Sequence, residues 1–206
     1  MNYQKYAVII WLSIVSMLHG CAAYSITTIP IEEVPELKIG SPLAGIRSLT
    51  FLVNEFEDAR PFKGSVILAS ERGRIELNQK VSELVTQSIA NELKRNGHKV
   101  LRSNESDNAD VIIKGVVRRY WIESKPVSLF SLRLSGTVEA EISVNGQGTE
   151  KVIPKIYRGD YYIDGNSIGP LIWRDILNQA LTEMIKEFTT DEEFLGRIKQ
   201  VRRKSS

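Results

Sequence analysis

The sequence predicts an α+β fold of two layers, in which two helices pack on one face of an antiparallel or mixed sheet. First, apolar and polar residues alternate strictly from Leu132 to Val144, which is typical of a strand with one buried face. Second, residues 81–93 and 173–188 carry apolar residues three and four positions apart, which is typical of helices that bury one face. Third, the order of strand, helix, short strand, three long strands and helix suits a two-layer domain.

Composition and charge are those of an ordinary globular protein, and the net charge does not select a partner. The chain of 206 residues is 42% hydrophobic and 25% charged, as in globular proteins, so disorder and a polytopic membrane protein are disfavoured. Its formal net charge of +2 supplies no bulk basic field. We therefore expect one domain and no nucleic-acid partner.

Residues 1–20 are predicted to form a signal peptide. Lys5 is the only charged residue, and the thirteen residues from Tyr6 to Leu18 are almost entirely apolar. A membrane-spanning helix needs about 20 such residues, whereas a signal peptide needs about 7–15. This segment is therefore excluded from the fold.

The only cysteine, Cys21, follows this run directly. Leu18 and Gly20 stand where a bacterial lipobox carries them, so Cys21 is expected to take a diacylglycerol and palmitate, which would anchor the chain stably. The alternative is a buried free cysteine. Ala22, rather than Asp, follows Cys21 and favours the outer membrane, periplasmic face. An acylated Cys21 leaves the mature chain no free thiol for a disulfide or thiolate metal site.

Residues 21–48 read as the lipidated cysteine and a tether punctuated by Pro30, Pro35 and Pro42. Many apolar residues, among them Ile29 and Leu37, favour an alternative in which part of this arm packs on the domain. Residues 49–195 form the expected α+β domain, and residues 196–206 a basic C-terminal tail.

The elements of the domain are predicted in chain order. A strand covers residues 49–56, and a loop or short strand follows at 64–73. Asn78 is expected to cap a helix that ends at Asn96-Gly97. A short strand at 99–101 precedes a long one at 111–122, which is apolar on both phases and therefore expected at the sheet centre.

The second half of the domain is predicted as a hairpin and a helix. A loop at 124–128 precedes the alternating strand. Asn145-Gly146 indicates a hairpin to a return strand at 151–163, which Pro154 marks as an edge strand or a bulge. The loop 165–169 leads into the last helix, whose apolar stripe must face the sheet.

Seven short motifs follow one another along the chain: residues 58–61 (DARP), 93–100 (LKRNGHKV), 109–113 (ADVII), 144–146 (VNG), 155–159 (KIYRG), 178–181 (NQAL) and 190–191 (TD). Together with the lipobox they make residues 49–195 resemble the YajG family of bacterial lipoproteins. The resemblance implies a small envelope lipoprotein with no established activity and no catalytic residues to assign.

Candidate catalytic groups are few. Outside the predicted leader, His98 is the only histidine, and it is expected to be a surface or capping residue. Glu55, Glu57 and Asp58 could form an acid–base pair, but an Asp58–Arg60 ion pair that fixes a turn is the favoured interpretation. The glycines of the 165–169 loop lack P-loop spacing. We expect no catalytic residue, no metal and no cofactor.

Arg118, Arg119, Tyr120 and Trp121 form a candidate partner surface, because basic and aromatic residues adjoin on one strand; a sheet edge is the alternative. The sequence thus favours a non-catalytic, outer-membrane-anchored lipoprotein that binds an envelope protein or polymer in the periplasm. One alternative is an auxiliary lipoprotein of an envelope lipid or transport system, which needs an apolar groove between sheet and helices. A second is a hydrolase that uses Glu55 and Asp58.

Overall fold

The computed structural model describes residues 27–29, 41–69, 73–101, 108–146, 154–165 and 169–201. The predicted leader, Leu18, Gly20, Cys21, residues 147–153 and the last five residues lie outside this range. Its elements in chain order are β1 (Thr27–Ile29), the 3₁₀ helix η1 (Pro42–Gly45), β2 (Thr50–Val53), β3 (Glu57–Asp58), β4 (Val66–Ala69), β5 (Gly73–Leu77), α2 (Val81–Arg95), β6 (Lys99–Leu101), β7 (Val111–Ser128), β8 (Ser131–Gly146), β9 (Lys155–Gly165), α3 (Pro170–Thr190) and α4 (Glu192–Gln200).

One mixed sheet is organised around β7, which is 18 residues long. β8 pairs antiparallel with it along almost its whole length, and β9 continues the sheet beyond β8. β2, β3 and β4 follow one another along the other edge of β7, each in parallel. The predicted α+β fold with a mixed sheet is confirmed.

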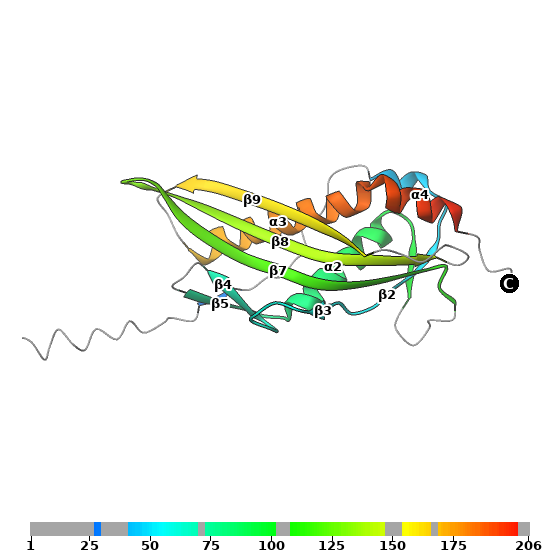
Figure 1. Ribbon diagram of the computed structural model, residues 1–206, viewed down its shortest axis with the longest axis horizontal. Helices are drawn as coiled ribbons and strands as arrows, with labels where there is room; N and C mark the ends of the chain where they lie inside the picture. The colour runs from blue at the N-terminus through cyan, green and yellow to red at the C-terminus, as the bar shows by residue number, and fades with distance from the viewer. Residues whose placement is uncertain are drawn as a thin grey trace, which may run out of the picture.

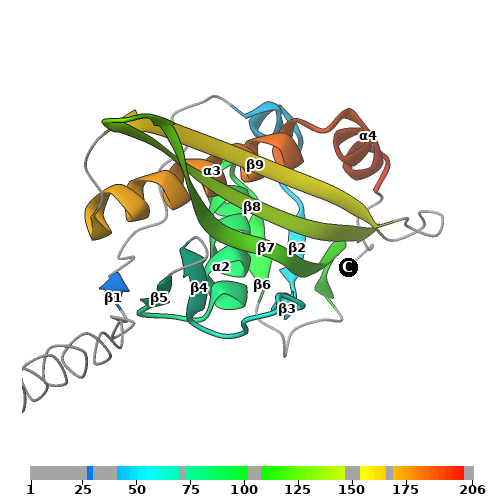
Figure 2. The same ribbon diagram turned by 60° about the vertical axis from the view of Figure 1, so that its left-hand side comes forward.

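Two long helices cover one face of this sheet (Figures 1 and 2). The residues that predicted them are buried: Val81, Leu84, Val85, Ile89 and Leu93 in α2, and Ile176, Leu177, Ala180, Leu181, Met184, Ile185 and Phe188 in α3. Pro170 opens α3, as its fixed φ favours at the first helical position. α2 ends before Gly97, whose φ of 85° is the left-handed conformation that glycine adopts at a helix end.

The predicted start of α2 is wrong. The helix begins at Val81 after Lys80, which makes no side-chain capping bond, so Asn78 is not the cap. β5 runs to Leu77, and the chain must still turn before the first apolar residue of the helix meets the core.

Parts of the predicted tether contact the domain, as the packed-arm alternative expected. β1 adds a strand beside β5, and η1 places Leu43 in the core at 0% exposure. Pro42 opens η1, and the Leu43 N–H donates to the Ser41 hydroxyl at 3.2 Å.

The domain also continues past residue 195, where a basic tail was expected. The Asp191 carboxylate caps α4 by accepting from the Glu193 N–H at 3.1 Å. Phe194 stacks on Phe188, with ring centroids 4.4 Å apart, and Val201 is buried. The sequence pattern missed this helix because its few apolar residues stand among charged ones.

Candidate interaction surface

The Asp58 and Arg60 side chains form a buried clamp. The Arg60 guanidinium is 4% exposed and donates to both carboxylate oxygens of Asp58 at 2.8 Å. It also donates to the carbonyls of Gly64 and Val66, at 2.8 and 3.1 Å, while the Gly64 N–H donates to Asp58. The clamp therefore closes the turn between β3 and β4, as the favoured interpretation predicted.

Electrostatics hold this clamp in its charged form. Burial on its own would raise the pKa of Asp58, but the hydrogen bonds from Arg60 and from the Gly64 N–H outweigh it and lower the pKa. Glu55 and Glu57 are exposed on either side of buried Phe56. Asp58 is thus a saturated ion-pair partner, which speaks against its use as an acid or base beside Glu55.

His98 is not at the surface, contrary to expectation. It is 5% exposed, its Nδ1 accepts from the Leu49 N–H at 3.3 Å, and its ring meets Phe51 edge-on at 5.1 Å. The short strand β6 begins at the next residue and pairs with β2, which draws His98 into the core. Burial lowers the pKa of His98, and the Leu43 backbone carbonyl opposes this shift only in part.

Stability should therefore fall as the pH drops below about 6.5. The unfolded chain takes up a proton on His98 near that pH, while the folded chain does so only at lower pH, so protonation favours unfolding. Urea unfolding at pH 7.5 and 5.5 should show a loss of up to about 1 kcal/mol. A His98→Asn variant keeps an acceptor but cannot titrate, and should lose this difference; an equal loss in both proteins would exclude His98 as the cause.

A β-bulge decides which predicted surface residues are accessible. The β7–β8 register shifts between Val117 and Arg119, so the inward-facing phase changes from Val117 to Tyr120. Arg118 is exposed and Arg119 and Trp121 are partly so, but Tyr120 is only 1% exposed. The prediction that Tyr120 belongs to a partner surface is therefore wrong.

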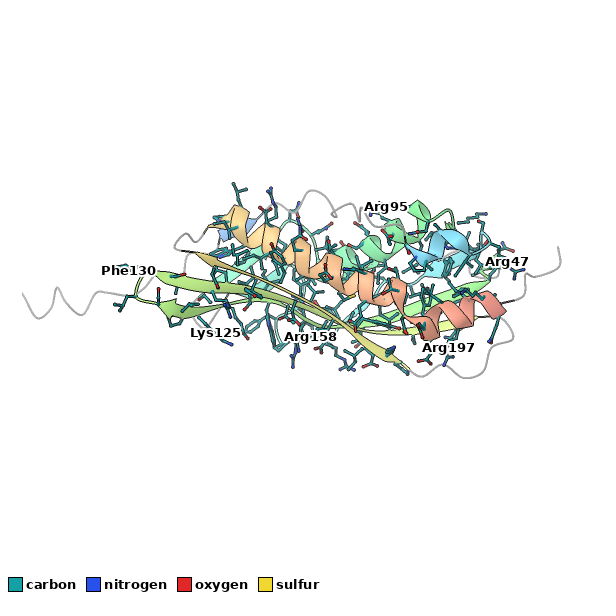
Figure 3. All side chains as sticks on the ribbon, turned by 90° about the horizontal axis from the view of Figure 1, so that it is seen from above. Arg47, Arg95, Lys125, Phe130, Arg158 and Arg197 are labelled. Carbon is teal, nitrogen blue, oxygen red and sulfur yellow. The ribbon has the colours of Figure 1, made fainter. Side chains whose placement is uncertain are left out.

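The apparent basic character of this surface is neutralised by neighbouring strands. Arg118 and Arg119 on β7 meet Glu141 and Glu139 on β8, at 2.6 and 3.7 Å. On β9, a hydrogen bond from Arg158 is the main cause that lowers the pKa of Asp160. Figure 3 shows Arg158 on the side of the sheet away from α3. We call this side of β7, β8 and β9 the outer face.

Exposed apolar side chains adjoin these ion pairs. On β9, Ile156 is 54% and Tyr162 58% exposed, and the Arg133 guanidinium lies 4.5 Å from the centre of the Tyr162 ring. Neither residue stands out in the sequence, because in an edge strand their alternation with charged residues resembles an ordinary wet face.

The second group lies at the β7–β8 turn. Val127, Leu129 and Phe130, which we call the hairpin tip, are 52%, 95% and 86% exposed. A loop was expected at 124–128, but β7 continues to Ser128. The run of polar residues there hid a strand that pairs with β8 up to Ser128, apart from an irregularity at Val127, and needs no core of its own.

α3 lies directly against the β8–β9 ribbon. A Cβ on Gly159 would come within 1.9 Å of the Ala180 carbonyl oxygen and 2.4 Å of the Met184 nitrogen, both backbone atoms of α3. A Cβ on Gly136 would approach Ile176 to 2.7 Å. This packing leaves no room for a ligand between α3 and β9 at Gly159, which speaks against a lipid-carrying groove there.

No helix among the described residues is both long and apolar enough to cross a bilayer.

No family model matches the sequence, and no curated protein matches it. Solved structures do match. A Chlamydia trachomatis hypothetical protein aligns with a TM-score of 0.42 at 7% identity, over 75% of this chain and 97% of that one. A Neisseria meningitidis lipoprotein aligns with a TM-score of 0.35 at 12% identity, over 61% and 90%.

A Xanthomonas campestris protein described by the family model DUF330 has a higher TM-score than these two structures. It aligns with a TM-score of 0.55 at 15% identity, over 81% of this chain and 93% of that one. At this identity the likeness concerns the fold alone: the chain shares its architecture with the DUF330 structure.

Proposed function

We propose that the protein is a lipoprotein anchored through Cys21 in the outer membrane, on its periplasmic face, and that its domain binds an envelope partner without catalysis. The observation that carries the proposal is the motif Leu18-His19-Gly20-Cys21 at the end of a thirteen-residue apolar run. Thr27, the first residue of β1, follows Cys21 by only six positions. The anchor would thus hold the sheet close to the bilayer. The YajG resemblance fits this role.

Two features of the domain favour binding over chemistry. The buried polar clamp of Asp58 and Arg60 is saturated by its own neighbours. The outer face combines paired charges with exposed Ile156 and Tyr162 on an edge strand. Such mixed surfaces are common where proteins associate reversibly, since aromatic side chains supply contact area and the charges set orientation.

Photo-crosslinking in intact cells tests this function. A benzophenone side chain in place of Ile156 on the outer face should yield a discrete adduct with an envelope component. The same group at Lys186, which lies on α3 away from the outer face, is the matched control and should yield none. Adducts of equal yield from both positions, or from neither, would contradict a partner on the outer face.

A further inference from the structure

The hairpin tip projects beyond the rest of the domain. Ser128 and Ser131 form the last pair of β7 and β8, and only Leu129 and Phe130 lie between them. Figure 1 shows this hairpin at one extreme of the long axis, with α4 towards the other, and Figure 3 places Phe130 at its end. The most exposed large apolar side chains described in the domain are therefore at its most protruding point.

The turn residues are unusual for their position. Two-residue hairpin turns favour Asn, Asp and Gly, which adopt the required backbone conformations at little cost. Here Leu129 and Phe130 occupy both positions, while Ser128 supports the turn by accepting from the Phe130 N–H at 3.3 Å. Local turn chemistry does not explain two large apolar residues in water, so a contact outside the domain is the physical reason that remains.

The strand directions place the start of β1 towards the same end of the molecule. β4 runs parallel to β7, β5 antiparallel to β4, and β1 parallel to β5. β1 therefore runs opposite to β7, and its first residue, Thr27, faces the end at which β7 turns. Figure 2 shows β1, β4 and β5 on the side of the hairpin tip. The first described residue of the chain, Thr27, is therefore on the tip side of the sheet.

The lengths involved agree as well. Thr27 pairs with Ile75, and Ile75 pairs with Ile67. Ile67 stands two residues before Ala69, which pairs with Ile122 on the parallel strand β7, so Thr27 is level with Tyr120. From this level to Leu129 the strand advances by about 30 Å at roughly 3.3 Å per residue. Thr27 follows Cys21 by six positions, and a chain of this length spans at most about 20 Å. With the strands pointing at the membrane, the tip would therefore lie at least about 10 Å beyond Cys21 even if this segment were fully extended, which is enough for an interfacial insertion.

We propose that the hairpin tip inserts into the lipid interface of the membrane that holds the anchor, an inference that rests on the proposed lipoprotein function. Val127, Leu129 and Phe130 supply the apolar contact. The nearest basic residues already have acidic partners: Lys125 lies 3.0 Å from Glu123, and Arg133 lies 2.8 Å from Asp164. Zwitterionic lipid is therefore sufficient, and the contact depends little on lipid charge. Two attachments instead of one fix the orientation of the outer face towards a partner.

The test uses the full-length protein, extracted from cells with its anchor and reconstituted into phosphatidylcholine vesicles that contain nitroxide-labelled acyl chains. A fluorophore is attached to a cysteine introduced as Ser131→Cys beside the tip, or as Asn145→Cys at the far end of the same hairpin. We expect quenching at position 131 to be roughly three times that at position 145. A Leu129→Ser/Phe130→Ser change should reduce it to the level at 145 without shifting the thermal transition, because both side chains are exposed. Adding anionic phosphatidylglycerol to the vesicles should change the quenching at position 131 little.

The remaining outcomes each overturn one specific statement. A fluorophore at 131 with the emission of bulk water and no quenching overturns the insertion. An apolar emission without quenching shows a protein contact, such as a second copy, and overturns the lipid as occupant. Equal quenching at both positions shows a domain that lies flat on the bilayer, and overturns the insertion of the tip alone. Labelling of the protein without an introduced cysteine shows a free Cys21, in which case the proposed anchor itself fails, separately from the tip.

Discussion

Replacing Gly159 with alanine should destabilise the domain by about 3 kcal/mol, because the added Cβ would collide with backbone that cannot rotate away. The new atom would lie 1.9 Å from the Ala180 carbonyl oxygen, so α3 or β9 would have to move. Since Ala180 and Met184 are completely buried, such a movement would disturb the main core. Urea unfolding followed by circular dichroism measures the loss.

Gly196→Ala is the matched control. Gly196 lies within α4, and a Cβ there meets nothing within 4 Å. Alanine favours the helix over glycine by up to about 1 kcal/mol, so this variant should be at least as stable as the wild type. If Gly159→Ala and Gly196→Ala had the same free energy of unfolding, the close approach of α3 to β9 would be refuted.

Replacing Arg60 with methionine should also cost about 3 kcal/mol, for an electrostatic reason. The change leaves the Asp58 carboxylate without its guanidinium partner, and the carbonyls of Gly64 and Val66 without a donor. Removing one partner of a buried ion pair typically costs about 3–5 kcal/mol of stability. The Asp58 side chain is 12% exposed, so water can solvate its charge in part and the cost should lie near the lower end of this range. Chemical denaturation at neutral pH measures the effect.

Arg118→Met provides the comparison, since it breaks a pair of similar chemistry at the surface. The Arg118 and Glu141 side chains are 45% and 25% exposed, and exposed pairs contribute at most about 1 kcal/mol. Adding Asp58→Asn to Arg60→Met should cost less than the two single changes summed, because the unpaired charge disappears. Strict additivity, or an Arg60→Met variant as stable as Arg118→Met, would show that the clamp does not stabilise the turn.

The elements that periodicity could predict are those that bury one continuous stripe. In β8 every second residue from Leu134 to Val144 is buried, as the alternation in the sequence predicts, and the apolar spacings of α2 and α3 match the residues that the structure buries. β7 shows where periodicity fails. Its apolar residues occupy both phases for two reasons: the bulge at Arg118 reverses the pleat, so that Val117 and Tyr120 face the same core, and Ile112 packs on a second, small cluster of Leu52, Leu101 and Ala109. The pattern alone indicated only a strand buried on both faces. One inserted residue therefore moved Tyr120 from the expected surface into the core.

The candidate site was only partly predictable for the same kind of reason. The Asp58–Arg60 pair is local in sequence, so its role could be derived from spacing. The neutralisation of Arg118 and Arg119 depends on partners twenty or more positions away on β8 in the paired register, and no local pattern contains it. The hairpin tip was hidden because Ser124 and Ser128 suggested a loop in place of two strands that extend beyond the core.

The most direct test of the central claim is palmitate incorporation in growing cells, read together with the mass of the first peptide of the membrane-extracted protein. The wild-type chain should incorporate labelled palmitate and begin at Cys21, with a diacylglyceryl group on its sulfur, whereas Cys21→Ser should incorporate none and Ala22→Ser should behave like the wild type. Equal labelling of Cys21→Ser, or a wild-type chain that retains Met1 and an unmodified Cys21, would contradict the lipoprotein assignment.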